Sequence, residues 1–183
     1  RHFADSQPDD LVLLIDAYDT ALGAQRAAEL ADELRSKGVR VKAVRIDSGV
    51  LGEEARRVRK ILDEAGHPGI GIFASSGIDE YLISELVSAQ APITGYGIGT
   101  SLVTSDDMPY LNCAYKLQEY AGIPRRKRSH GKATWPGRKQ VYRYYDEQGQ
   151  LDYDRLCSAD EPGETGQPLL QIVMQSGQRL HEP

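Results

Sequence analysis

The strongest constraint on the fold of this chain is a unit of apolar strand, polar turn and amphipathic helix that repeats four times in the first hundred residues. The strands are almost continuously apolar, which is typical of a parallel sheet with both faces buried. A parallel sheet with helices between its strands is an α/β fold. The expected strands are residues 11–15, 41–46, 70–74 and 91–96, and the expected helices are about 21–37, 53–65 and a segment through residues 82–87.

Polar side chains gather where these strands end. Parallel strands place their carboxyl ends at one edge of the sheet, where the sites of barrels and open α/β sheets lie. Four units amount to half of an eight-unit barrel, so we expect exposed sheet edges that pair with another chain or with a missing half. The residues at this edge are Asp16, Asp19, Arg45, Asp47, Ser48, Ser75, Ser76, Gly99 and Thr100.

The segment 97–105 follows the fourth strand and is rich in glycine and hydroxyl residues. Gly97 and Gly99 let the backbone approach an anion closely, and Thr100 and Ser101 can donate hydrogen bonds to its oxygens. This pattern favours a phosphate site. The alternative is a flexible turn between strand and helix, in which glycine and serine are common.

Composition limits the class of protein. The chain is 40% hydrophobic and 27% charged, as in soluble globular proteins, and lacks the roughly 20-residue apolar run of a membrane span. Its net charge of −5 argues against a nucleic-acid-binding protein. Cys113 and Cys157 lack the spacing of a zinc site, so we expect reduced thiols and no metal-ligating cluster. We expect a cytoplasmic protein without membrane or nucleic-acid partners.

The pattern changes after Ser105. Residues 112–120 are expected to form a strand, and residues 140–145 and 151–153 a hairpin. We therefore divide the chain into a partial barrel, residues 1–110, and a β-rich appendage, residues 111–183. The basic segment 125–132 could contact polyphosphate, nucleic acid or solvent, and the acidic remainder of the chain favours polyphosphate over nucleic acid.

Several segments together resemble one family. They are residues 14–20, 45–49, 73–80, 97–100, 127–143 and 168–180, which cover nearly the whole chain in order. The chain is similar to the C-terminal portion of the nicotinate phosphoribosyltransferases. The resemblance implies the C-terminal half of a (β/α) barrel of the type II phosphoribosyltransferase kind, followed by a small antiparallel β appendage.

The resemblance also implies an activity. The expected reaction forms nicotinate mononucleotide and pyrophosphate from nicotinate and phosphoribosyl pyrophosphate, coupled to ATP hydrolysis, with Mg²⁺ as cofactor. Asp47 would face the ribose and Arg45 would lie near the nicotinate carboxylate, as the catalytic pair. The expected substrate-binding residues are Asp16, Ser48, Gly49, Ser75, Ser76, Gly77, Gly97, Gly99 and Thr100, with Lys127, Lys132 and Lys139 as secondary basic contacts.

Structural roles remain open for some of these residues. Asp47 could cap the following helix, Arg45 could form an ion pair at a strand end, and Asp16 with Asp19 could serve turn geometry. The chain also departs from the family pattern. Its departures are Val50 in place of an aspartate, Ser76 and Gly77 in place of an asparagine and an aspartate, and Ser101 in place of an arginine.

The family's phosphorylated histidine lies in a segment before the first strand, and the chain contains no such segment. We therefore predict no catalytic role for His2, His67, His130 or His181. The expectation is a fragment that lacks its N-terminal half and is inactive alone, from a family whose sites imply a homodimer. Two alternatives stay open: a non-catalytic nucleotide- or partner-binding remnant, and another phosphate-binding barrel enzyme, although no lysine lies at a strand end to support Schiff-base chemistry.

Overall fold

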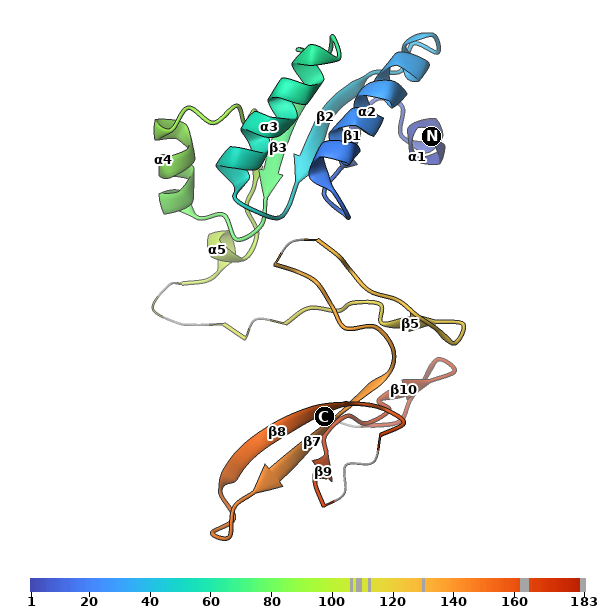
Figure 1. Ribbon diagram of the computed structural model, residues 1–183, viewed down its shortest axis with the longest axis vertical. Helices are drawn as coiled ribbons and strands as arrows, with labels where there is room; N and C mark the ends of the chain where they lie inside the picture. Colours follow the sequence, from blue (N-terminus) through green and yellow to red (C-terminus); the bar gives the residue numbers. More distant parts are fainter. Residues whose placement is uncertain (106, 108–109, 112, 130, 162–164, 182–183) are drawn as a thin grey trace. The chain divides into compact units, whose positions relative to one another are not determined.

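A four-stranded parallel sheet forms the centre of the first part of the chain (Figure 1). The computed structural model describes residues 1–105, 107, 110–111, 113–129, 131–161 and 165–181. The strands pair in chain order: β1 (Leu11–Leu14), β2 (Val41–Ile46), β3 (Gly71–Ser75) and β4 (Gly95–Gly97). The helices are α1 (His2–Ser6), α2 (Thr20–Arg35), α3 (Leu51–Glu64), α4 (Glu80–Ser88) and α5 (Thr100–Val103).

The core lies on one face of this sheet. Helices α2 and α3 pack side by side on that face, as Figure 1 shows. Alternate strand residues point into this layer and are buried with the helices, among them Leu11, Val44, Ile46 and Ile72. The intervening residues of β1, Val12 and Leu14, are 37% and 46% exposed. The sequence therefore correctly predicted apolar strands, but only one face of the sheet is covered among the described residues.

Local signals fix the helix starts. Asp19 caps α2 by accepting a hydrogen bond from the Leu22 amide, and Asp79 caps α4 by accepting one from the Leu82 amide. Asp19 thus has the structural role that the sequence left open. Asp47 does not cap α3, whose N-cap residue is Val50 without a side-chain cap bond. The helix-capping alternative for Asp47 is wrong.

The expected strand 91–96 is the least accurate of the four. Only Gly95–Gly97 forms strand β4 beside β3, and before it the Thr94 amide donates to the Ile72 carbonyl at 2.8 Å. Pro92 has no amide proton, and the Thr94 hydroxyl contacts the amide and the carbonyl of Ile72, 3.0 Å from each. The Thr94 side chain thus occupies the Ile72 amide, which a residue of a longer strand would otherwise bind through its carbonyl.

The second part of the chain is antiparallel. Strand β7 (Lys139–Tyr145) pairs with β8 (Leu151–Ser158) and with β9 (Gln167–Pro168). Short pairs join β5 (Glu119–Tyr120) to β6 (Ile123–Pro124), and β10 (Met174–Gln175) to β11 (Gln178–Arg179). The predicted hairpin is confirmed, with longer strands than expected.

The expected strand over residues 112–120 is wrong, apart from its last two residues. Asn112 lies outside the described residues. Residues 113–117 are exposed and have no strand partner, so their apolar side chains have no layer to pack against. Apolar content alone does not make a strand where no neighbouring strand supplies hydrogen bonds.

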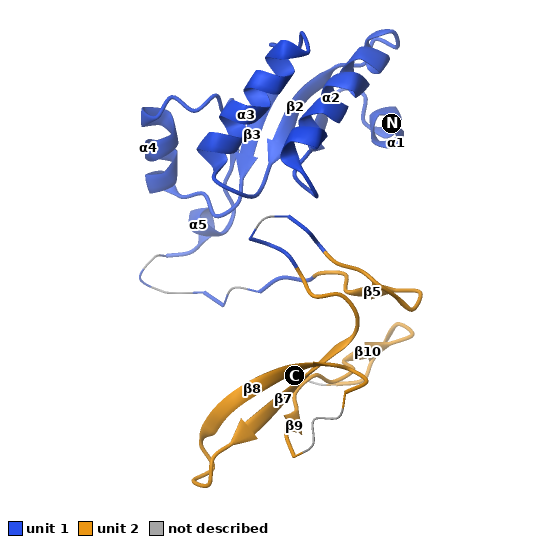
Figure 2. Cartoon of the chain, viewed as in Figure 1, with its two compact units in different colours: residues 1–115, 127–133 blue, residues 116–126, 134–183 orange. Residues whose placement is uncertain are grey.

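The chain divides into two compact units (Figure 2). The first comprises residues 1–115 and 127–133, and the second comprises residues 116–126 and 134–183. The basic segment is thereby split, because residues 127–133 belong with the parallel sheet. Within the described residues, no helix is both long and apolar enough to cross a membrane.

Candidate functional site

The carboxyl ends of β1 and β2 are joined by a buried carboxylate. Asp16 follows β1 and is only 4% exposed. Its Oδ2 atom accepts hydrogen bonds from the Asp47 amide at 2.8 Å and from the Ser48 hydroxyl at 2.5 Å. These bonds fix the backbone directly after β2. Asp16 therefore positions Asp47, in addition to any contact with a substrate.

Asp47 is the centre of the site. Its Oδ1 atom accepts a hydrogen bond from the Ser75 hydroxyl at 2.8 Å, and its Oδ2 atom accepts one from Lys132 Nζ at 2.6 Å. Partial burial by itself raises the pKa of Asp47. The hydrogen bonds from Lys132 and Ser75 and the charges of Lys132 and Arg45 lower this pKa by a larger amount. The net pKa is below its ordinary value, so the carboxylate is ionised at neutral pH.

Residues 127–133, which we call the basic loop, reach this edge of the sheet through two contacts. Lys132 Nζ also donates to the Asp47 carbonyl oxygen at 2.6 Å. Ser129 is 3% exposed, and its hydroxyl donates to the Asp16 carbonyl oxygen at 3.0 Å. Sequence reasoning missed Ser129, because a serine within a run of arginines and lysines looks like a solvated loop residue. His130 lies outside the described residues.

Unusual backbone conformations surround Asp47. Gly49 and Gly77 have φ angles of +76° and +57°, which glycine adopts without strain. Ser76 has a φ angle of +98°, which strains a residue with a β-carbon. Such strain is typical of functional turns, and Ser76 is one of the predicted substrate-binding residues.

The other predicted residues differ in position. Arg45 is exposed on β2, two residues before Asp47. Gly97 ends β4, and Gly99 precedes Thr100 at the start of α5. Lys127 belongs to the first unit, but Lys139 belongs to the second.

Lys139 is already occupied within its own unit. Its Nζ atom donates to the Gly137 carbonyl at 2.6 Å and to Gln118 Oε1 at 3.1 Å. Lys132 Nζ also has two partners, but both are atoms of Asp47, whereas the partners of Lys139 lie in the second unit. Lys139 is therefore a weaker candidate than Lys132.

A cavity of about 660 Å³ adjoins the Asp47 site. One side is polar and includes Ser48, Ser76 and Lys132, whereas Leu82 and Leu86 supply apolar surface. This size is within the range of small-molecule sites. Among the described residues, no cluster of three or more histidine, cysteine or acidic side chains could hold a metal ion by itself.

Comparisons with known proteins identify relatives over nearly the whole chain. A Mycobacterium tuberculosis protein named nicotinate phosphoribosyltransferase pncB2 is 44% identical over 175 residues, covering 93% of this chain and 36% of that protein. The Bacillus subtilis nicotinate phosphoribosyltransferase is 38% identical over 141 residues, covering 73% of this chain and 29% of that protein. The chain thus spans about a third of the length of the curated relatives it matches. No family model matches it.

Solved structures give weaker likenesses. Human nicotinic acid phosphoribosyltransferase aligns with a TM-score of 0.46 and 25% identity over 99% of this chain and 39% of the human chain. A Pyrococcus furiosus nicotinate-nucleotide pyrophosphorylase aligns with a TM-score of 0.44 and 28% identity over 94% of this chain and 42% of that chain. Such TM-scores do not define a shared arrangement, so the assignment rests on the sequence relatives. By its sequence, this chain belongs to the nicotinate phosphoribosyltransferase family.

Proposed function

We propose that this chain supplies the phosphoribosyl-binding edge of a nicotinate phosphoribosyltransferase. The reaction would form nicotinate mononucleotide and pyrophosphate from nicotinate and phosphoribosyl pyrophosphate, coupled to ATP hydrolysis. The observation that carries the proposal is the ionised Asp47, held by Ser75 and Lys132 at the edge of the sheet where α/β enzymes bind ligands. Membership of the family supports the same reaction.

The chemistry needs negative charge near the sugar. Displacement of pyrophosphate by the pyridine nitrogen develops positive charge on the ribose ring, and a fixed carboxylate stabilises that charge. Asp47 has this role in the proposal, because its geometry is set before substrate arrives. Arg45 is exposed two residues away, and a guanidinium is suited to pairing with the nicotinate carboxylate.

Phosphate groups would be bound by backbone and lysines. Gly97, Gly99 and Thr100 would receive the 5′-phosphate, and Lys127 and Lys132 the pyrophosphate. Mg²⁺ is usually held by one or two carboxylates together with substrate phosphates. Asp47 could supply one such carboxylate, and this arrangement needs no cluster of three protein ligands, which the described residues do not form. The ion would neutralise charge on the leaving pyrophosphate.

The uncovered face of the sheet supports the finer fold proposal. Val12 and Leu14 are exposed there although both belong to the apolar strand β1. Apolar side chains in this position are typical of a barrel interior, where further strands complete the packing. We therefore propose half of a (β/α) barrel that is completed by further residues of a longer enzyme. We also propose a cytoplasmic location and, because the family's sites imply it, a homodimer.

A chimera tests the function in a complete enzyme. The 175-residue stretch of the Mycobacterium tuberculosis relative that aligns with this chain is replaced by the chain, and nicotinate mononucleotide formation is measured. The expected result is activity that falls by about 100-fold or more in Asp47→Asn, because one charge at the reacting sugar is lost.

The matched control is Glu64→Gln, which removes a negative charge from an exposed residue of α3 that lies 3.8 Å from Lys60. This control is expected to keep full activity. A chimera that binds phosphoribosyl pyrophosphate but forms no product contradicts the proposed catalysis and favours the binding remnant.

A further inference from the structure

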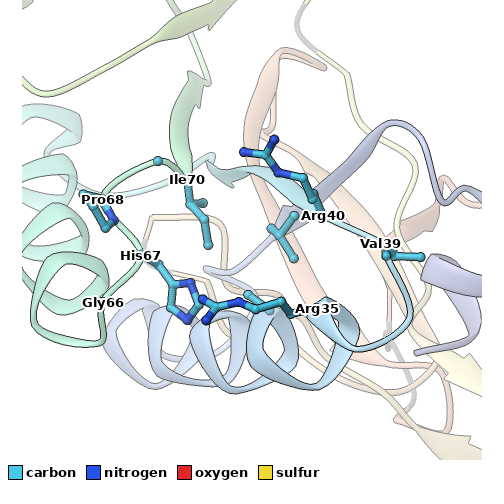
Figure 3. Close-up of a pocket in the computed structure, with 11 residues that line it drawn as sticks. Arg35, Val39, Arg40, Gly66, His67, Pro68 and Ile70 are labelled. Carbon is cyan, nitrogen blue, oxygen red and sulfur yellow. The ribbon is translucent and has the colours of Figure 1, made fainter.

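A second cavity lies at the amino ends of β2 and β3, the edge of the sheet opposite Asp47. Figure 3 shows its wall, in which residues 38–41 lead into β2 and residues 66–70 lead into β3. The volume is about 440 Å³, enough for a small organic ligand. All of its lining residues belong to the first unit.

Three of the lining side chains carry or can carry positive charge: Arg35, Arg40 and His67. Figure 3 shows Arg35 and His67 at the α2 side of the cavity. The acidic neighbour is Asp32, whose Oδ1 atom lies 3.2 Å from His67 Nε2 and 3.6 Å from Arg35. This carboxylate thus lies beside Arg35 and His67, and Arg40 adds a further cation to the lining, so hydrogen-bond donors outnumber this one acidic neighbour.

His67 supplies a buried ring nitrogen that has a carboxylate nearby but no hydrogen bond. Its side chain is 7% exposed, and among the described residues Nε2 has no hydrogen bond, since the Asp32 contact lacks hydrogen-bond geometry. A buried unsatisfied polar group is costly, so a native structure normally gives it a partner. A ligand oxygen in the cavity would provide one.

The loop that carries His67 is held rigidly. Arg59 donates to the His67 carbonyl at 2.8 Å and to the Ile70 carbonyl at 2.6 Å, and its guanidinium also contacts Asp63. The His67 amide donates to the Leu62 carbonyl at 2.8 Å. The backbone that carries the imidazole is therefore held in place, which favours a preorganised contact.

The remaining wall is apolar and open. Ala31, Val39, Val41 and Ile70 supply aliphatic surface. A β-carbon on Gly38 or Gly69 would meet no atom within 4 Å, so the space beside these glycines is empty. A bare phosphate ion would leave this surface unused.

We propose that this cavity is a second ligand site of the chain, specific for a phosphate monoester with an apolar body. Arg35 and Arg40 bind the phosphate oxygens, His67 Nε2 donates to one of them, and the apolar group lies against Val39 and Ile70. Several donors around one group suit a dianionic phosphate better than a carboxylate, which a single arginine satisfies.

The test is a titration of the isotope-labelled 183-residue chain with phenyl phosphate, followed by NMR. Amides of Val39, Arg40, His67 and Gly69 are expected to shift with a Kd of about 1 mM or tighter. Benzoate and inorganic phosphate are titrated in parallel, and each is expected to bind at least about tenfold more weakly, since each lacks one half of the recognised chemistry.

The double variant Arg35→Gln, Arg40→Gln is expected to weaken phenyl phosphate binding by at least about tenfold through loss of charge-assisted hydrogen bonds. Both side chains are exposed, and the variant's own spectrum reports whether its fold is kept. The matched control is Arg57→Gln. Arg57, like Arg35, is an exposed arginine on a helix, but it lies outside the cavity.

Three results would overturn the proposal. They are the absence of saturable shifts up to about 10 mM phenyl phosphate, equal loss of binding in Arg57→Gln, and binding of inorganic phosphate as tightly as the ester. None of these readouts depends on the proposed transferase activity, so failure here leaves that activity untouched.

Discussion

At the scale of single residues, Asp47 shows how a tertiary contact sets the charge of a site. Its carboxylate is partly buried, which alone would favour the neutral form. Lys132 comes from a segment 85 positions later in the chain and reverses that preference. The ionised state is therefore a property of the folded first unit and not of the local sequence.

The first prediction concerns Lys132→Met. Removal of the ammonium leaves Asp47 partly buried without its cation, and the free energy of unfolding is expected to fall by about 1 kcal/mol at pH 7. Because the pKa of Asp47 is lowered in the native state, this contribution is present above pH ~4 and is lost as the pH falls through the native pKa.

Urea unfolding of both proteins between pH 3 and pH 7 measures the difference. Lys60→Met is the control, since Lys60 is exposed and lies 3.8 Å from Glu64. A gap between wild type and Lys132→Met that stays constant down to the lowest pH would show that the ion pair is not its source.

The second prediction concerns Ser129→Ala. The hydroxyl is buried and donates to the Asp16 carbonyl, so its loss leaves that acceptor without this partner. We expect about 1–2 kcal/mol lower stability and faster hydrogen exchange in residues 127–133. Ser36→Ala is the control, because that hydroxyl is exposed and donates to the Glu33 carbonyl at the end of its own helix. Unchanged exchange in the basic loop would contradict a pinning role for Ser129.

At the scale of elements, the packing of α2 against β1 depends on a glycine. A β-carbon on Gly23 would lie 2.0 Å from the Ile15 carbonyl oxygen, closer than atoms can approach. Helix α2 therefore lies so close to the end of β1 that a residue with a β-carbon at position 23 would clash with the Ile15 carbonyl. This close approach holds the turn that contains Asp16.

The third prediction follows from this contact. Gly23→Ala is expected to destabilise the chain by about 2–3 kcal/mol despite the higher helix propensity of alanine, because backbone must move to relieve the clash. Gly69→Ala is the matched control, since a β-carbon there meets nothing within 4 Å. Thermal unfolding of the two variants checks the difference, and equal midpoints would be inconsistent with the close packing of α2 on β1.

At the scale of the whole chain, the hydrophobic core is unevenly distributed. Nearly all buried apolar residues belong to the first unit, whereas Cys157 is the buried apolar residue that the second unit contributes among the described positions. Antiparallel hairpins without a packed layer are marginally stable. The two units are therefore expected to differ in local stability.

The fourth prediction is a contrast in amide hydrogen exchange. Amides of β2 and β3 are expected to exchange slowest, because they lie under α2 and α3 in the core. Amides in the β7–β8 ladder are expected to exchange at least about 100-fold faster, reflecting a difference in opening free energy of several kcal/mol. Similar protection in both units would mean that the second unit has stability beyond its own described core.

Much of the first unit could be predicted because its signals are local. The apolar runs at β1 and β2 and the polar residues at the strand ends each require only a few neighbouring residues. The strand expected over residues 112–120 failed because strand formation depends on a partner that sequence does not reveal. Ser129 was missed for the same reason, since its acceptor is 113 positions away.

The sequence by itself determined the alternation of strands and helices, the family and the edge of the sheet at which Asp47 lies, because periodicity and motif order are written along the chain. Only the tertiary structure decided that Lys132 pairs with Asp47, that Ser129 holds the basic loop, and that Lys139 belongs to another unit. It also placed Arg35 and His67 on one cavity. The physical reason is that a pKa, an ion pair or a cavity depends on distances between residues that folding brings together, and spacing along the chain does not contain those distances.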